Sequence, residues 1–240
     1  MATAIAVIFL VSCVTVKPPT YVSRGPGWYT VKRSDTLYSI AWRYGLDHKQ
    51  LASWNKIAVN SPIHPGQRLR LLKPGDQTVA AGSAQKPSSK TKTKTKTKTK
   101  TKSKATTTSK NDQFGTSGPA KWIWPTKGKP LNTFLVSKLD RRGIDIAGKA
   151  GQPVRATAAG KVVYSGNGLA GYGNLVIIKH SDTYLSAYAY CRERLVEEGK
   201  FVKSGQVIAK MGRRDNVAKL HFEIRRNGKP VDPMKYLPNQ

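Results

Sequence analysis

A run of alternating lysine and threonine, KTKTKTKTKTKTKSK at residues 90–104, is the feature that most constrains what this chain can fold into. The run contains no acid and no large apolar side chain, so its like charges repel and it has nothing to bury. It predicts an extended, disordered tether over residues 74–120. Two segments of mixed composition remain for folding, residues 28–73 and residues 121–240, and we expect one domain from each.

An apolar run near the N-terminus, AIAVIFLVSC, ends at Cys13. It is shorter than the roughly 20 residues that a membrane-spanning helix needs, but long enough for the apolar part of a signal peptide. A buried core segment is the alternative. LVSC resembles the lipobox of bacterial lipoproteins, which implies a signal peptide over residues 1–12, lipidation of Cys13 and an anchor segment over residues 13–27. Val14 stands where the common Gram-negative sorting rule has Asp for inner-membrane retention, so the resemblance implies the outer membrane, facing the periplasm.

The charge of the chain is strongly one-sided. Its 240 residues include 42 Lys and Arg against 13 Asp and Glu, a formal net charge of +29. This excess predicts an anionic partner: nucleic acid, an acidic lipid face, or the carboxylates and phosphates of a cell envelope. The Lys–Thr run has no interleaved aromatic residues, so as a nucleic-acid tail it would offer only electrostatic contact. Together with the implied periplasmic location, this favours attraction to the cell wall and to lipid phosphates, with no nucleic-acid partner.

Residues 28–73 begin with a short strand pattern followed by a helix pattern. Ser34, Asp35 and Thr36 offer cap oxygens for the helix. The helix carries one apolar stripe at i, i+3, i+4 and i+7, and Gly45 stops it. The members of the stripe are Leu37, Ile40, Ala41 and Tyr44.

A second helix pattern follows in the same segment. Asp47 and Gln50 form a plausible cap pair at its start. Leu51 and Trp54 are the residues that this helix is expected to bury. IHPGQRLRLL then supplies a Pro-Gly turn and a closing strand. The sum is a small α+β domain with the order strand, helix, helix, strand.

This segment resembles a LysM domain, because YTVKRSDTLYSIA, the central WN and IHPGQRL match that family in order. Ser34 stands where the family usually has Gly. The resemblance implies binding to the N-acetylglucosamine-containing glycan of peptidoglycan, in a groove between the first strand–helix loop and the loop after the second helix. The implied glycan-binding residues are Asp35, Thr36, Leu37, Pro62 and Ile63. Capping and packing are the alternative roles for these residues.

Residues 121–240 contain successive strand candidates parted by Gly and Asn turns, with little helical periodicity. The candidates are GKVVYSG, GNLVIIKH, TYLSAYAY, GQVIAKM and LHFEIRRNGKPV. Asn227-Gly228 in the last of them is a strong hairpin signal. In KLHFEIRR, polar and apolar residues alternate, which is typical of a strand with two unlike faces. We predict a mostly antiparallel, all-β domain.

The second segment resembles the lysostaphin/LytM-type metallopeptidase domain through RRGIDIAGKAGQPVRATAAGKVVYSG, GYGNLVIIKHSDTYLSAYAY and LHFEIRRNGKPVDPMKYL. That family holds zinc with a His-x-x-x-Asp pair and the second His of a His-x-His motif, and two further histidines assist catalysis. In this sequence the three ligand positions carry Arg141, Asp145 and His221, and the two assisting positions carry Tyr190 and Lys219. Three of the five functional positions are therefore replaced.

Coordination chemistry determines what these replacements mean. A catalytic zinc needs about three protein ligands and an open water position, whereas Asp145 and His221 supply two. Arg141 stays protonated and would place a positive charge beside the dication. Lys219 adds another positive charge, and Tyr190 is a poor general base near neutrality. We therefore expect no metal or other cofactor and no peptidase activity.

LytM-like domains without zinc ligands, joined to a LysM domain and a lipobox, are the architecture of NlpD-type murein hydrolase activators. GNGLAGYGNLVIIKH, YLSAYA, LHFEIR and the final KYLP resemble that group. The resemblance implies a non-catalytic lipoprotein that binds a periplasmic N-acetylmuramoyl-L-alanine amidase and activates it for septal cell-wall splitting. The implied partner-binding groove consists of Arg141, Asp145, Tyr190, Lys219 and His221.

Two other functions stay open at this point. One is a zinc metallo-endopeptidase that cleaves peptidoglycan cross-links, and the other is a passive wall-binding lipoprotein without an amidase partner. Within the cleft, Asp145 could also pair with Arg141 or Lys219 and simply fill the metal cavity.

Overall fold

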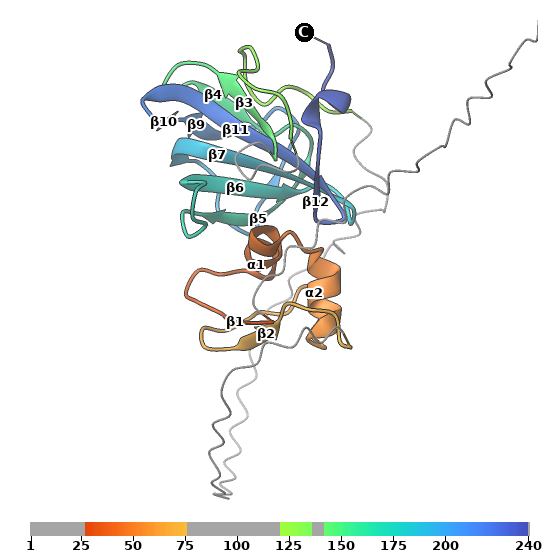
Figure 1. The fold of residues 1–240 in the computed structure, drawn as a ribbon. Coiled ribbons are helices and arrows are strands. Elements are labelled where there is room, and N and C mark those ends of the chain that lie inside the picture. Colours follow the sequence, from red (N-terminus) through yellow and green to blue (C-terminus); the bar gives the residue numbers. More distant parts are fainter. Residues whose placement is uncertain (1–26, 76–120, 136–141, 240) are drawn as a thin grey trace, which may run out of the picture.

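A two-stranded sheet and two helices form the first folded unit. The computed structural model describes residues 27–75, 121–135 and 142–239, so the predicted signal peptide, Cys13 and residues 76–120 of the predicted tether lie outside the described residues. The elements of the first unit are β1 (Trp28–Thr30), α1 (Leu37–Tyr44), α2 (His48–Trp54) and β2 (Arg68–Arg70). β1 and β2 pair antiparallel, which confirms the predicted strand, helix, helix, strand order (Figure 1).

Local sequence signals explain where both helices begin and end. Thr36 is the N-cap of α1: its hydroxyl accepts the Ser39 N–H at 3.0 Å, and the Ser39 hydroxyl accepts the Thr36 N–H at 2.9 Å. Gly45 ends α1 in the left-handed conformation, at φ 65°. Asp47 caps α2 by accepting two backbone N–H groups of its first turn. No helix among the described residues is long and apolar enough to cross a membrane.

The first unit has a small core of its own. Its buried members are Val31, Leu37, Ile40, Ala41, Leu51, Ala52, Leu69 and Leu71. Trp54, which the sequence predicts to be buried with Leu51, is only half-buried because it packs outside this core. Tyr38 and Trp42 are also outside it, although both are buried. They lie on another face of α1 and pack against the second unit.

The second unit is built from strands that pair only antiparallel, as the sequence predicts. Its strands are β3 (Ile144–Ala147), β4 (Pro153–Arg155), β5 (Gly160–Gly166), β6 (Asn174–Lys179), β7 (Tyr184–Arg194), β8 (Phe201–Val202), β9 (Val207–Met211), β10 (Arg213–Arg214), β11 (Val217–Arg226) and β12 (Lys229–Val231). A 3-10 turn, Pro233–Lys235, follows them. The predicted Asn227-Gly228 turn links β11 to β12, with φ values of 50° and 75°.

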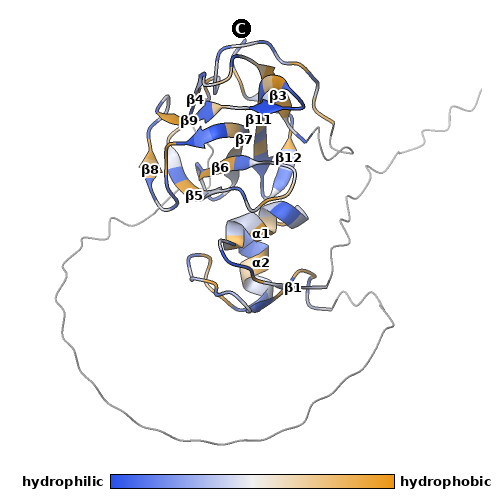
Figure 2. Ribbon diagram, turned by 90° about the vertical axis from the view of Figure 1, so that its left-hand side faces the viewer, coloured by the Kyte–Doolittle hydropathy of each residue, from blue (hydrophilic) through white to orange (hydrophobic). Residues whose placement is uncertain are grey.

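The central path of the sheet runs β10-β11-β7-β6-β5-β8, with β3 and β12 on β11 and with β9 joining β4 to β7. Apolar residues recur along these strands (Figure 2). Those on one face form the main core, which includes Leu220, Phe222 and Ile224 of β11. The opposite face of β5, β6 and β7 carries a second apolar cluster, which includes Tyr38 and Trp42 of α1. Helix α1 lies beside β5, so the first unit covers part of this face (Figure 1).

Candidate functional site: a charged cleft and an adjoining pocket

The predicted cleft residues come together on three neighbouring strands. Asp145 on β3 pairs directly opposite His221 on β11, and His221 pairs opposite Ala189 on β7. Lys219 lies two residues before His221, so it projects from the same face of β11. Arg141, the remaining predicted ligand position, lies outside the described residues.

Both carboxylate oxygens of Asp145 are held by nitrogen groups. The Nζ atom of Lys219 lies 2.9 Å from Oδ2, and Nδ1 of His221 lies 2.7 Å from Oδ1. Burial by itself raises the pKa of Asp145, but the hydrogen bonds from His221 and Lys219 outweigh burial and lower it. The structure thus contains the pairing of Asp145 with Lys219 that the sequence left open.

The side chains present do not fit the family's zinc site. A catalytic zinc takes about three protein ligands, whereas Asp145 and His221 supply two and hydrogen-bond each other directly. Zinc also requires a neutral imidazole, and the Lys219 ammonium already occupies the second oxygen of Asp145. Within the described ranges, no group of three or more His, Cys, Asp and Glu side chains is placed to hold a metal ion.

A chain of charges continues from His221 along β11. Nε2 of His221 lies 3.3 Å from Oε1 of Glu223, and Nε of Arg225 donates to Oε2 of Glu223 at 3.0 Å. The hydroxyl of Tyr172 also donates to Glu223, at 2.8 Å. Burial lowers the pKa of His221, but its hydrogen bonds to Asp145 and Glu223 raise it to about 9. Burial raises the pKa of Glu223, but Arg225 and His221 lower it to about 2, so the acid is charged although it is 0% exposed.

Sequence reasoning missed the two charged residues beyond His221. Glu223 and Arg225 alternate with apolar residues in the same register as Lys219 and His221, so the period-2 pattern could have placed all four on one face. What the pattern could not supply is the contact of Arg225 with Trp42, which belongs to the first unit.

Tyr190 reaches the cleft through an irregularity in β7. Regular alternation would send its side chain into the main core with Tyr188, but Tyr190 has a left-handed backbone, at φ 59°, and the pairing of β7 with β9 is irregular just beyond it. The ring of Tyr190 therefore lies on the cleft side, with its centroid 5.5 Å from that of His221 and 5.7 Å from Nζ of Lys219. Cys191 returns to the core, where burial raises the pKa of its thiol to about 12.

The five predicted glycan-binding residues line one pocket with a volume of about 420 Å³. Asp35 and Thr36 come from the loop before α1, Leu37 is the first residue of α1, and Pro62 and Ile63 come from the loop after α2. Their placement agrees with a groove between these two loops, and their contact with glycan stays a prediction.

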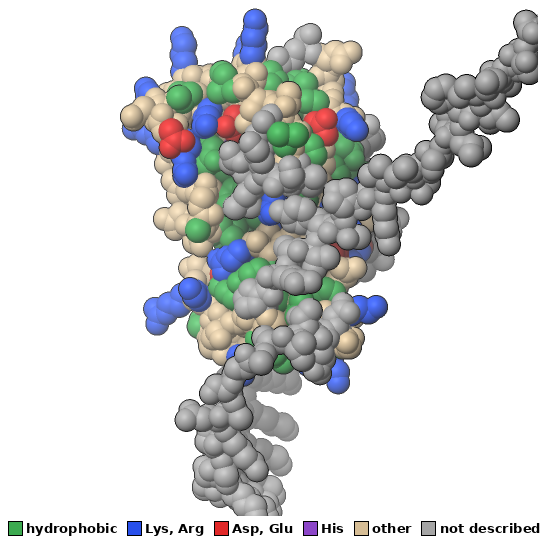
Figure 3. Space-filling view, viewed as in Figure 1, with side chains coloured by type: hydrophobic (Ala, Val, Ile, Leu, Met, Phe, Trp, Pro, Cys, Tyr) green, Lys and Arg blue, Asp and Glu red, His purple; other side chains and the backbone are tan. Residues whose placement is uncertain are grey.

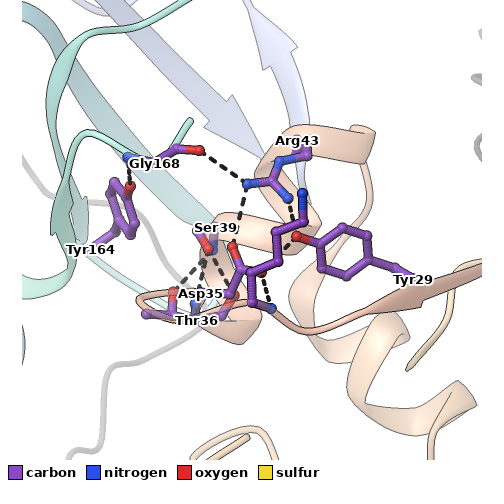
Figure 4. Close-up of polar contacts among 8 residues, drawn as sticks. Tyr29, Asp35, Thr36, Ser39, Arg43, Tyr164 and Gly168 are labelled. Atoms are coloured by element: carbon purple, nitrogen blue, oxygen red, sulfur yellow. Dashed lines mark hydrogen bonds and ion pairs between the residues drawn. The ribbon is translucent and has the colours of Figure 1, made fainter. Parts of the chain in front are cut away.

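Asp35 and Thr36 also have structural roles, as Figure 4 shows. Asp35 accepts hydrogen bonds from the Tyr29 hydroxyl at 2.6 Å and from the Lys32 N–H at 2.8 Å. It also forms an ion pair with Arg43, whose guanidinium donates to Tyr29 as well. The carboxylate of Asp35 is thus fixed by its own domain, and its predicted capping role at α1 belongs to Thr36 instead.

The two units meet through a polar and apolar interface. The guanidinium carbon of Arg225 lies 3.5 Å from the ring centroid of Trp42, and Nη1 donates to the Trp42 carbonyl at 2.7 Å. Trp42 is 2% exposed and Arg225 is 1% exposed. Arg43 donates to the carbonyl of Gly168 at 3.3 Å (Figure 4). The charged row of β11 therefore runs from the cleft to the first unit.

Both folded units match known families. The model of the LysM domain matches residues 29–71, and that of peptidase family M23 matches residues 140–233. The lipoprotein NlpD/LppB homologue of Pseudomonas aeruginosa is 50% identical over an alignment of 232 positions, which covers 89% of this chain and 78% of that protein.

Two proteins of Escherichia coli are similar over nearly the same share of the chain. The murein hydrolase activator NlpD is 40% identical over an alignment of 257 positions, which covers 88% of this chain and 68% of that protein. The lipoprotein YgeR is 42% identical over 213 residues, covering 88% of this chain and 81% of that protein. With a LysM domain followed by a domain of peptidase family M23, this chain belongs to the NlpD family.

Proposed function

We propose that this protein is an envelope lipoprotein that binds peptidoglycan through its LysM domain and activates a periplasmic N-acetylmuramoyl-L-alanine amidase through its M23 domain. It does not hydrolyse peptidoglycan itself. Relatives named as murein hydrolase activators support a role at the cell wall. The observation that carries the non-catalytic assignment is Asp145, whose two oxygens are held by Lys219 and His221 where the family holds zinc.

The amidase would dock over the outer layer of the cleft. Asp145 and His221 are buried, whereas Lys219 and Tyr190 are partly exposed above them. Arg214 adds a further cation, with its guanidinium carbon 5.5 Å from the ring centroid of Tyr190. This aromatic and basic surface suits an acidic segment of a partner, because it offers both charge complementarity and a flat ring for contact.

Lipidation of Cys13 would hold the protein at the outer membrane, facing the periplasm. The names of the relatives as lipoproteins support this assignment. Many basic side chains stand out from both domains on the face shown in Figure 3, which favours attachment to an anionic wall. A Cys13→Ser variant should leave the membrane fraction for the soluble periplasm, and its retention in the outer membrane would rule out this anchor.

Amidase stimulation by the whole chain tests the central proposal. The Cys13→Ser protein is treated with a chelator, desalted, and mixed with a zinc-loaded amidase of the same organism on dye-labelled peptidoglycan. We expect dye release by the mixture and none by the chain alone. Lys219→Gln should reduce the stimulation, whereas Lys149→Gln, at an exposed position in the turn before β4, should leave it unchanged.

The remaining functions give different results in the same assay. A metallo-endopeptidase would cleave muropeptides without the amidase, and cleavage would rise when zinc is restored to the treated chain. A passive wall-binding protein would sediment with peptidoglycan but stimulate no amidase of that organism. Either outcome would overturn the activator assignment.

A further inference from the structure

The pocket that holds the predicted glycan residues has a second wall, which belongs to the M23 domain. Its M23-side lining consists of Lys161, Val162 and Val163 of β5, Lys179 of β6, and Glu198 and Gly199 before β8. Thr36 connects the two walls at the base, because its hydroxyl donates to the carbonyl of Val163 at 3.3 Å. A volume of about 420 Å³ lies in the range of roughly 300–1,000 Å³ that small-molecule sites occupy.

The M23 wall carries two neighbouring lysines and a carboxylate. Lys161 and Lys179 are direct cross-strand partners on β5 and β6, and like charges in that position repel. The carboxylate of Asp182 offsets part of this positive charge. Its Oδ1 lies 2.8 Å from Nζ of Lys179, and its Oδ2 lies 3.2 Å from Nζ of Lys49. Glu198 brings an exposed carboxylate to the same wall. Ammonium and carboxylate groups together suit a ligand rich in hydroxyl, amide and carboxylate oxygens.

The pocket exists only while the two domains are docked. Tyr38 and Trp42 of α1 pack into the apolar cluster on β5, β6 and β7, and Lys49 bridges the domains through Asp182. Gly228 of the β11–β12 turn touches the loop before α2 so closely that a Cβ there would lie 2.3 Å from the Leu46 carbonyl oxygen. A ligand that contacts both walls must therefore bind the docked arrangement more tightly than separated domains.

We propose that the M23 domain completes the glycan site of the LysM domain. A segment of the N-acetylglucosamine-containing glycan binds between the LysM loops and the wall formed by Lys161 and Glu198, and its binding holds the two domains together. This inference rests on the glycan binding of the proposed function. It adds that the M23 domain is itself a glycan-contacting element, which fixes the orientation of its cleft relative to the bound strand.

Calorimetric titration of the full Cys13→Ser chain with a soluble hexamer of N-acetylglucosamine tests the composite site. We expect Lys161→Gln and Glu198→Gln each to weaken binding about fivefold, since each removes one charged hydrogen-bonding group at a solvent-accessible site. Lys149→Gln removes an exposed lysine of the same domain outside the pocket lining and should bind as the unmodified protein does. Peptide-free glycan strands from peptidoglycan, which carry muramyl carboxylates, should show a larger loss with Lys161→Gln than the neutral hexamer.

Coupling of glycan binding to domain docking is tested with Trp42→Ala. This variant substitutes no residue of the pocket lining but removes a main contact between the domains. Affinity should fall at least as far as in Lys161→Gln, and adding Lys161→Gln to Trp42→Ala should cost little more. Failure of the unmodified chain to bind either probe would refute the proposed LysM function. If the unmodified chain binds and Lys161→Gln, Glu198→Gln and Trp42→Ala bind with the same affinity, glycan binding by the LysM domain stands and the composite site is refuted.

Discussion

Replacing Trp42 with alanine should separate the two domains without unfolding either one. Trp42 lies on α1, yet it is absent from the core of the LysM domain and is buried in the cluster on β5, β6 and β7. Its ring stacks on Arg225, and its carbonyl accepts a hydrogen bond from the same guanidinium. The side chain of Trp42 therefore contributes to docking rather than to the folding of its own domain.

The size of the effect follows from this burial. Truncating a buried tryptophan to alanine costs about 3–5 kcal/mol. A desolvated cation–π contact such as that with Arg225 accounts for about 2 kcal/mol of such a loss. Because these contacts lie between the domains, the docking equilibrium should shift by roughly 10²- to 4 × 10³-fold toward the open form. Arg225 would keep its hydrogen bond to Glu223 but lose the ring above it.

Small-angle X-ray scattering of the full chain measures the result directly. The radius of gyration should rise in Trp42→Ala, while circular dichroism should retain the spectrum of the folded protein. Trp28→Ala provides the matched control, because Trp28 lies in the same domain but is 47% exposed on β1, away from α1. A scattering curve for Trp42→Ala that overlays those of the unmodified protein and Trp28→Ala would refute the claim that this residue holds the domains together.

Three further predictions concern backbone strain, pH and domain contact. Ser34 has a left-handed φ of 64°, so Ser34→Gly should stabilise the LysM domain by about 1 kcal/mol in thermal unfolding; a lowered melting temperature would contradict this. Burial lowers the pKa of His180 from 6.5 to about 4, so the folded state binds fewer protons than the unfolded state in this interval. The contribution of His180 to stability should therefore fall by about 3 kcal/mol between pH 6.5 and pH 4, measured as the difference between denaturant titrations of the unmodified protein and of His180→Gln; a difference that does not change with pH would count against a neutral, buried imidazole. Gly228→Ala should raise the radius of gyration because its Cβ would collide with Leu46; Gly171→Ala, also at positive φ but with open space around it, should not, and equal effects would point to strain alone.

Motifs that act over a few residues were predictable from the sequence. The cap of α1 lay within the predicted triplet, and Gly45 and Asp47 mark helix ends through their own backbone chemistry. Alternation along β11 correctly placed Lys219 and His221 on one face, because a strand fixes the direction of each side chain. These features depend only on residues that are close together in the sequence, so they can be predicted from a single sequence.

The features that depend on contacts distant in sequence were not predictable. Nothing near Tyr190 indicates the left-handed backbone that turns its ring toward His221. Tyr38 and Trp42 lie off the apolar stripe of α1, so the pattern alone leaves them without a partner until the M23 sheet supplies one. The second wall of the pocket beside Asp35 and Thr36 arises from the same docking and has no signature in the LysM segment.

Under the proposed non-catalytic function, the row of charges along β11 also limits how a zinc site could arise in this domain by mutation. Replacing Lys219 with histidine would restore one family residue but leave Asp145 hydrogen-bonded to a protonated His221, which Glu223 holds from the other side. Removing one member of a buried ionic group costs about 3–5 kcal/mol, because its neighbour is left unbalanced. Each single substitution toward the family's zinc ligands should therefore give a less stable protein before a zinc site is complete, so such a site would require several simultaneous changes.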